Sequence, residues 1–214
     1  MNPLVFGECM KSNSKHWNRI FRETADEKMG WYESNPVETI RMLSQIPNWG
    51  GSTIFLPGAG TSLLIETLQE AGANLVLNDI SAEALDHTKQ RLGEKGSNCE
   101  WLCQDIAQPL ENSIPIDIWI DRAVLHFLLE EGDIQGYFKN VLTAVKPGGH
   151  ALFSEFSPVG APKCAGLKLH RYSVEEFSER LGSAFMLIDH FDHTYINPAG
   201  DPRPYIYALF KRIA

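Results

Sequence analysis

The chain has 214 residues, of which 43% are hydrophobic and 21% are charged, as is typical of a single globular domain with a sizeable core. A net charge of −8 argues against nucleic acid or an anionic membrane as the main partner, and we expect neither. The scattered Cys9, Cys99, Cys103 and Cys164, together with a polar N-terminus lacking a secretory signal, indicate a reducing cytoplasm.

Short apolar runs alternate with longer amphipathic segments along most of the chain. Residues 1–50, which contain Trp17, Trp31 and Trp49, are predicted to form a helical cover. Strands are predicted at 53–56, 74–79, 99–105, 116–121 and 150–156. Helices are predicted between them at 61–71, 81–96 and 130–145, and KPGG at 146–149 is predicted to be a turn.

The alternation of strands and helices predicts a parallel sheet with helices on both faces. The last part of the chain differs, because FMLIDHFDHTYI at 185–196 and PYIYALFKRI at 204–213 read as an antiparallel hairpin. Sheets of this type bind ligands beyond the carboxyl ends of their strands. We therefore look for functional residues at those ends.

The stretch FLPGAGTS at 55–62 joins a strand to a helix through a glycine turn, which alone is weak support for a ligand site. Asp79 ends the next strand, where a carboxylate can accept hydrogen bonds from two ribose hydroxyls. Asp105 and Ile106 follow the third strand and suit the rim of an adenine ring. The alternative is that both aspartates only cap the following segments, but the combination favours a nucleoside pocket.

The neighbouring residues narrow the kind of nucleoside. Leu63 is bulky where a dinucleotide fold needs a third small residue, and no GKS or GKT follows the turn. The sequence thus predicts a pocket for an adenosine without phosphate, a description that S-adenosyl-L-methionine fits.

The order of motifs resembles the class I S-adenosylmethionine-dependent methyltransferases over about residues 50–214. The motifs are the glycine turn, DIS, QDI, DRAVLHFL, KPGG and the terminal hairpin. FLPGAG and HWNRIFRETADEKMGWYESNP further resemble the thiopurine and thiol methyltransferase branch, where proline precedes the turn and no acid stands before it. The resemblance implies an α/β, Rossmann-like, doubly wound sheet of seven strands, mostly parallel with the last strand antiparallel.

The same resemblance implies one methyltransferase domain over residues 1–214. Its parts would be a helical N-terminal cover (1–50), a cofactor-binding core (51–156), and a substrate loop with the C-terminal hairpin (157–214). The residues expected to bind the cofactor are Pro57, Gly58, Ala59, Gly60, Asp79, Ile80, Asp105, Ile106, Asp121 and Trp31.

Two of these expectations carry a specific role. Because Leu56 stands where many such strands place an acid, the backbone carbonyls of Pro57 and Asp121 are candidates to accept from the cofactor's ammonium group. Trp31 is a candidate to close over the sulfonium, since an aromatic face attracts a cation. The alternative for Trp31 is a hydrophobic contact that supports the first helix.

The acceptor side is expected to use His126, Cys164, Arg171 and Tyr172, from segments after the fourth and fifth strands. The catalytic candidates are His126 and Tyr172. Methyl transfer needs a base only when the nucleophile arrives protonated, and a thiol or another soft nucleophile needs little help. The structural alternatives are a satisfied histidine at a helix start, a packing tyrosine and an inert surface thiol at Cys164.

Four residues near the C-terminus could suggest a metal site. Asp189, His190, Asp192 and His193 alternate between the two faces of a predicted strand, and we expect no metal.

The sequence therefore predicts an S-adenosylmethionine-dependent methyltransferase with a small-molecule acceptor, for which a thiol or another soft nucleophile is the candidate. Three alternatives remain open: a protein lysine N-methyltransferase, an NAD-dependent oxidoreductase, and a non-catalytic S-adenosylmethionine-binding module. The sequence gives neither the acceptor nor the oligomeric state.

Overall fold

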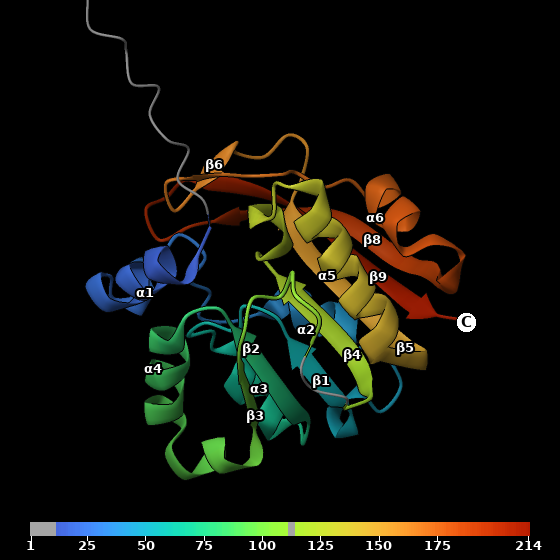
Figure 1. The fold of residues 1–214 in the computed structure, drawn as a ribbon, viewed down its shortest axis with the longest axis horizontal. Coiled ribbons are helices and arrows are strands. Elements are labelled where there is room, and N and C mark those ends of the chain that lie inside the picture. Colours follow the sequence, from blue (N-terminus) through green and yellow to red (C-terminus); the bar gives the residue numbers. More distant parts are fainter. Residues whose placement is uncertain (1–11, 111–113) are drawn as a thin grey trace, which may run out of the picture.

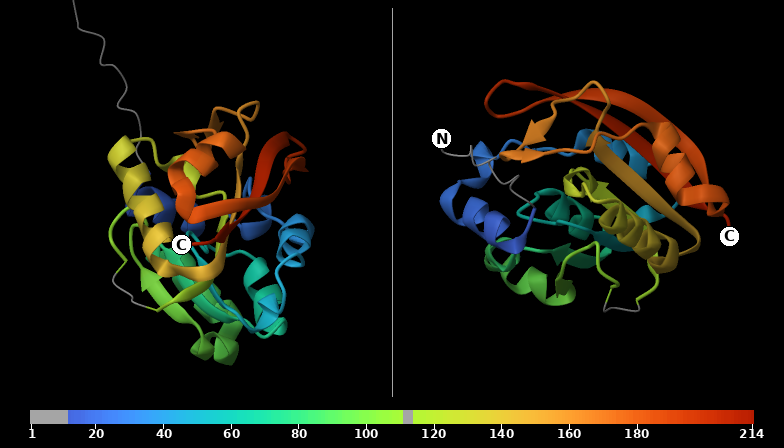
Figure 2. Two further views of the ribbon diagram at one scale, coloured as in Figure 1. Left: turned by 90° about the vertical axis from the view of Figure 1, so that its right-hand side faces the viewer. Right: turned by 45° about the horizontal axis from the view of Figure 1, so that its top comes forward.

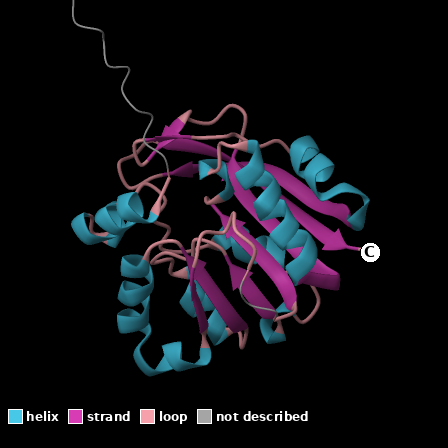
Figure 3. Ribbon diagram, viewed as in Figure 1, coloured by secondary structure: helices cyan, strands magenta, loops and turns pink. Residues whose placement is uncertain are grey.

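Seven strands lie side by side in one twisted sheet, with helices packed on both of its faces (Figures 1 and 3). This computed structural model describes residues 12–110 and 114–214. Residues 1–11 of the predicted cover, including Cys9, lie outside the described residues.

The strand order of the sheet is β3-β2-β1-β4-β5-β9-β8. The bounds are β1 Thr53–Leu56, β2 Asn74–Asp79, β3 Glu100–Cys103, β4 Ile116–Arg122, β5 Val145–Phe156, β8 Phe185–Ile196 and β9 Pro202–Arg212. A separate short hairpin is formed by β6 Lys163–Cys164 and β7 Leu167–Lys168. β1 to β5 pair in parallel, whereas β9 is antiparallel to both β5 and β8. The predicted seven-stranded, mostly parallel sheet with an antiparallel last strand is confirmed.

Six α-helices occur in the described part of the chain: α1 Ser14–Glu23, α2 Val37–Leu43, α3 Leu64–Glu70, α4 Ala82–Leu92, α5 Glu131–Ala144 and α6 Val174–Leu181. Short 3₁₀ turns are η1 Asp26–Lys28, η2 Trp49–Gly51, η3 Gly93–Asn98, η4 Leu125–Phe127 and η5 Gly182–Ala184. Side-chain oxygens of Asn13, Ser81 and Ser173 accept backbone N–H groups and so begin α1, α4 and α6.

Because side chains alternate between the faces of a strand, each central strand supplies two hydrophobic cores. On β1, Ile54 and Leu56 enter one core and Phe55 enters the other. Side chains of α2 and α3 close the first core, and side chains of α5 and α6 close the second. In the left view of Figure 2, α5 and α6 lie on the opposite side of the sheet from α2.

Several predicted boundaries were wrong for local reasons. The third strand ends at Cys103 instead of residue 105, because the Asp105 carboxylate accepts from Ala107 N at 2.9 Å and starts a turn. The helix predicted at 61–71 begins only at Leu64, and the helix predicted at 81–96 stops at Leu92, where Gly93 takes φ 54°. KPGG does not form a separate turn but bulges within β5. Ile116 is opposite Val145, whereas Ile118, two residues later on β4, is opposite His150, five residues later on β5.

The N-terminal cover is less helical than predicted. Within its described part, α1 and α2 are joined by the irregular segment 24–36, which includes η1. α1 lies beside α4, where the Asn18 side chain accepts from Ser81 Oγ at 2.7 Å and Arg22 pairs with Glu83 at 2.9 Å. Trp49 packs against the core closed by α2 and α3 and does not belong to the cover.

Candidate cofactor pocket

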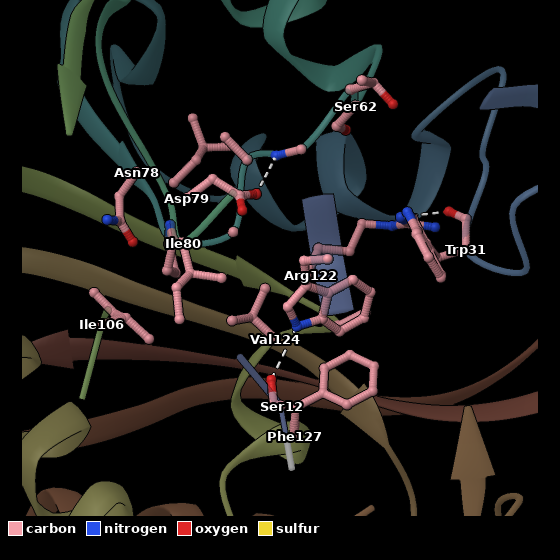
Figure 4. Close-up of a pocket in the computed structure, with 18 of the residues that line it drawn as sticks. Ser12, Trp31, Ser62, Asn78, Asp79, Ile80, Ile106, Arg122, Val124 and Phe127 are labelled. Atoms are coloured by element: carbon pink, nitrogen blue, oxygen red, sulfur yellow. Dashed lines mark hydrogen bonds between the residues drawn. The ribbon is translucent and has the colours of Figure 1, made fainter. Parts of the chain in front are cut away.

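A pocket opens at the carboxyl ends of β1, β2 and β4, next to α1 (Figure 4). The space between its walls is about 950 Å³ when open solvent at the mouth is included. The lining residues come from the cover, the glycine turn and three strand ends: Ser12, Trp17, Phe21, Trp31, Leu56, Pro57, Gly58, Ala59, Gly60, Thr61, Ser62, Leu64, Asn78, Asp79, Ile80, Gln104, Asp105, Ile106, Ile120, Arg122, Ala123, Val124, Phe127 and Leu128. Nine of the ten predicted cofactor residues lie together here; Asp121 is not among the lining residues.

The glycine turn forms a wall of the pocket that leaves no room for side chains. Gly58 has φ 50°, and a Cβ atom there would lie 2.3 Å from Val124 Cγ2. Gly60 has φ 53°, and its Cβ would lie 3.3 Å from the ring of Phe21. Positive φ and close approach together require glycine. The pocket therefore meets bare backbone at this turn.

Asp79 joins the turn to the end of β2. One carboxylate oxygen accepts from Gly60 N at 2.9 Å and the other from Ser81 N at 2.8 Å, and the first bond is drawn in Figure 4. The side chain is only 5% exposed, and this burial raises its pKa to about 6, although the backbone donors act in the opposite direction. A carboxylate can accept about four hydrogen bonds, so Asp79 keeps acceptor capacity for a ligand hydroxyl beside its backbone donors.

Apolar side chains line the part of the pocket beyond Asp79. Ile80 follows β2 and Ile106 follows β3, and both appear on the same side of the close-up (Figure 4). Asp105 lies between Gln104 and Ile106 at the pocket edge, with its Oδ1 engaged by Ala107 N. A flat heterocycle with one polar edge would fit such a surface.

Four aromatic rings form the opposite wall. The Trp17 ring centroid lies 5.6 Å from that of Trp31 and 4.8 Å from that of Phe127, in edge-to-face geometry. Phe21 lies 6.2 Å from Trp31, and Trp17 Nε1 donates to Ser12 Oγ at 2.9 Å. We call Trp17, Phe21, Trp31 and Phe127 the aromatic cover.

Arg122 ties the aromatic cover to the end of β4. Its Nη1 donates to the Trp31 carbonyl at 2.9 Å, and its Nε lies 2.9 Å from a Glu33 carboxylate oxygen. Both side chains are largely buried; burial raises the pKa of Glu33, and the neighbouring Arg122 lowers it. The Tyr195 hydroxyl on β8 donates to the Tyr32 carbonyl. Two side chains from the sheet thus hold the segment that carries Trp31.

Asp121 and His126 lie behind the pocket wall. Asp121 is fully buried; its carboxylate accepts from the Val124 and Leu125 N–H groups and from the Tyr137 hydroxyl at 2.6 Å. His126 is also fully buried, and its Nδ1 is hydrogen-bonded to Glu155.

The charge state of this buried group follows from its surroundings. Burial lowers the pKa of His126 to about 3 and raises that of Glu155 to about 7, so the imidazole is neutral. Burial and the neighbouring Glu155 also raise the pKa of Asp121. These side chains hold the 124–127 segment of the wall in place, and they do not line the pocket.

The other predicted acceptor residues also lie outside the pocket lining. Cys164 is half-buried in β6, and Arg171 is exposed, with Nη1 3.3 Å from the Gly160 carbonyl. Tyr172 is fully buried and stacks on Phe177 at 5.1 Å within the core under α5 and α6. The structural alternatives for His126 and Tyr172 agree with these positions.

Sequence reasoning missed Phe21, Phe127 and Arg122 as pocket residues. Trp17 and Phe21 are spaced i, i+4, which places both on one helix face and signals a common contact. Arg122 and Phe127 stand within DRAVLHFL, but only the strand-end geometry distinguishes their directions from those of Asp121 and His126.

Within residues 12–110 and 114–214, no group of three or more His, Cys, Asp or Glu side chains is arranged to hold a metal ion. In the same ranges, every helix is too short or too polar to cross a bilayer.

Known proteins resemble this chain in sequence and in fold. Residues 57–151 match a family model described as a methyltransferase domain. Over 120 residues the chain is 29% identical to ubiquinone biosynthesis O-methyltransferase of Coxiella burnetii. The aligned segment covers 56% of this chain and 50% of that protein. The chain therefore spans about half the length of this curated relative.

Solved structures resemble almost the whole chain. One, from work on the conversion of a disulfide bond into a thioacetal group during echinomycin biosynthesis, has a TM-score of 0.73 at 13% identity and covers 94% of this chain and 93% of its own. The N-methyltransferase NodS of Bradyrhizobium japonicum, in complex with S-adenosyl-L-homocysteine, has a TM-score of 0.69 at 17% identity, with 93% and 97% covered. These likenesses establish the Rossmann-like methyltransferase fold.

Residues 57–151 thus match a methyltransferase domain, and the fold around this segment is similar to that of solved methyltransferase structures. The matched segment begins at Pro57 and runs through the glycine turn, Asp79, Asp105 and β4 into β5. It thus contains most of the pocket just described.

Proposed function

We propose that the protein transfers a methyl group from S-adenosylmethionine to a small-molecule acceptor. The observation that carries this proposal is the convergence of the glycine turn, Asp79 and the Ile80–Ile106 surface in one pocket beside an aromatic cover. The Coxiella burnetii relative is named for O-methylation in ubiquinone biosynthesis, which favours a small acceptor over a protein.

The residues present fit this cofactor. Asp79 would accept the ribose hydroxyls, and Ile80, Asp105 and Ile106 would hold the adenine ring. Pro57 and Gly58 also line the pocket, so their backbone can be approached by the amino-acid end of the cofactor. When bound, the cofactor supplies an electrophilic methyl group attached to a positively charged sulfur.

The protein's own contribution would be positioning and exclusion of water. The aromatic cover would shield the transfer site, and aromatic faces stabilise nearby positive charge. In-line displacement gains much of its acceleration from correct alignment. No step assigned to this chain requires a proton transfer.

We further propose that the acceptor is a thiol or another soft nucleophile. Among the described lining residues there is no His, Lys or Cys, and the titratable side chains are Asp79, Asp105 and Arg122. Asp79 and Asp105 accept backbone N–H groups, and Arg122 is paired with Glu33. A pocket with this lining suits a nucleophile that needs no side-chain base.

The free thiols of Cys99, Cys103 and Cys164 favour a reducing compartment such as the cytoplasm.

Calorimetric titration with S-adenosylhomocysteine tests the cofactor part. We expect binding by the wild-type protein and by Asp86→Ala, an exposed carboxylate on α4, and strongly weakened binding by Asp79→Ala. NADH serves as the negative ligand. Absence of S-adenosylhomocysteine binding, or equal binding by Asp79→Ala, would overturn the proposal.

Transfer of labelled methyl groups tests the acceptor part. Small thiols, selenols, phenols and amines are compared at equal concentration, together with a lysine-rich protein extract. The proposal expects the highest rate with a thiol or selenol. Transfer only to phenols, amines or protein lysines would reject the soft-nucleophile assignment while keeping the cofactor assignment.

A further inference from the structure

The strand β8 forms one open edge of the sheet. Within residues 12–110 and 114–214, Phe185–Ile196 pairs with β9 on one side and with no strand on the other. His190 N donates to the neighbouring Asp189 carboxylate at 2.8 Å, so its N–H is directed away from β9. Since backbone direction alternates along a strand, Asp192 also presents its N–H and C=O to the open edge. Such an edge is a template for another strand.

Exposed apolar side chains gather on the same strand. Met186, Leu187, Ile188 and Ile196 are 48%, 36%, 41% and 57% exposed. They account for half of the large hydrophobic residues that are exposed in the described part of the chain. Met186, Leu187 and Ile188 lie at one end of the open edge and Ile196 at the other, and exposed apolar side chains beside an open edge are typical of an interaction surface.

The central sequence of β8 is self-complementary. Asp189-His190-Phe191-Asp192-His193 can pair with an antiparallel copy of itself about Phe191. His190 then lies opposite Asp192, Asp189 lies opposite His193, and each pairing occurs twice. Directly opposite side chains in an antiparallel pair lie on the same face, where an imidazole N–H can donate to a carboxylate.

We propose that β8 pairs with β8 of a second copy of this chain, across a two-fold axis at Phe191. Each half of such an interface supplies the same residues, as in most symmetric dimers. The pairing covers Asp189–His193, because the bulge between Leu187 and Asp189 ends the regular register there. The exposed residues at both ends of β8 flank this short ladder, and a five-residue ladder predicts a weak, concentration-dependent dimer.

The His190–Asp192 pairing decides the register. Asp189 also accepts from Gln45 Nε2 at 2.7 Å, and His193 lies 3.9 Å from Glu38, so both are shared with the α2 side. His190 and Asp192 lie on the exposed face. The opposite edge strand, β3, has only four residues and offers no comparable pattern.

Sedimentation velocity from about 1 to about 500 µM protein measures the dimer. H190D places two carboxylates opposite each other twice, and D192H does the same with two imidazoles. Carboxylates directly opposite each other repel in H190D, and D192H removes the carboxylates that accept from His190, so we expect each single variant to weaken dimerisation by about tenfold or more. The double variant H190D/D192H exchanges the two side chains and should restore dimerisation.

Asp86→His on α4 is the matched control and should dimerise like the wild type, and circular dichroism establishes that every variant is folded. A protein that stays monomeric at all concentrations overturns the proposal. So does a dimer unaffected by H190D and D192H. Failure of the double variant to recover would reject the register about Phe191.

Discussion

Replacing Gly58 with alanine should disable the pocket while leaving the protein folded. A non-glycine residue in left-handed backbone geometry such as φ 50° costs about 1–2 kcal/mol. The added Cβ would also lie 2.3 Å from Val124 Cγ2, well inside van der Waals contact, so the 124–127 wall or the turn must move. We expect Tm to fall by about 2–8 °C, since 1 kcal/mol shifts Tm by roughly 2–4 °C in a domain of this size.

The effect on the pocket should exceed the effect on stability, because both segments that must move line the ligand site. Gly51→Ala is the matched control, since a Cβ at Gly51 meets nothing within 4 Å and its φ is not positive. Thermal unfolding and titration with S-adenosylhomocysteine are measured on both variants. If Gly58→Ala matches Gly51→Ala in both Tm and affinity, the argument that the turn requires glycine is refuted.

Three further outcomes follow from buried polar contacts. The pKa of Asp79, about 6, is raised above its ordinary value of 3.8, so its contribution to stability is present at low pH and is lost as pH rises from 3.8 to about 6. Affinity for S-adenosylhomocysteine should rise as the pH increases towards and through about 6, where the folded-state carboxylate ionises, and titration of Asp79→Asn should show no such rise. Tyr137→Phe leaves Asp121 without its hydroxyl donor and should cost about 1–3 kcal/mol in urea unfolding; an unchanged midpoint would contradict this. Arg122→Lys loses the two contacts that the guanidinium makes at once, with the Glu33 carboxylate and with the Trp31 carbonyl. It should weaken ligand binding several-fold with little change in Tm.

Elements with a strong local pattern were predictable from the sequence. Apolar runs such as 53–56 and 74–79 match β1 and β2 residue for residue, because both strands are buried on both faces. Gly58, Gly60 and Asp79 were predictable as pocket residues, since a strand-to-helix turn and a strand end fix where their atoms point.

Side chains at the far end of β4 were not predictable in the same way. Asp121 and Arg122 are adjacent, and one is buried behind the wall while the other lines the pocket. His126 and Phe127 differ in the same manner. Whether each polar residue faces ligand or core depends on partners distant in sequence, namely Tyr137, Glu155 and the Trp31 carbonyl.

The buried acids explain how the pocket wall can be apolar on one side and hydrogen-bonded on the other. The N–H groups of Val124 and Leu125 begin η4, and they would be unsatisfied without the carboxylates of Asp121 and Glu155 behind them. Unsatisfied backbone groups in a buried wall are costly. With these donors satisfied from the core side, Val124 and Phe127 can present only hydrocarbon to the ligand. Asp121 and Glu155 therefore serve to satisfy the backbone of the wall and do not face the ligand. The proposed transfer then depends on alignment of the reactants and on the nature of the acceptor, without a side-chain base.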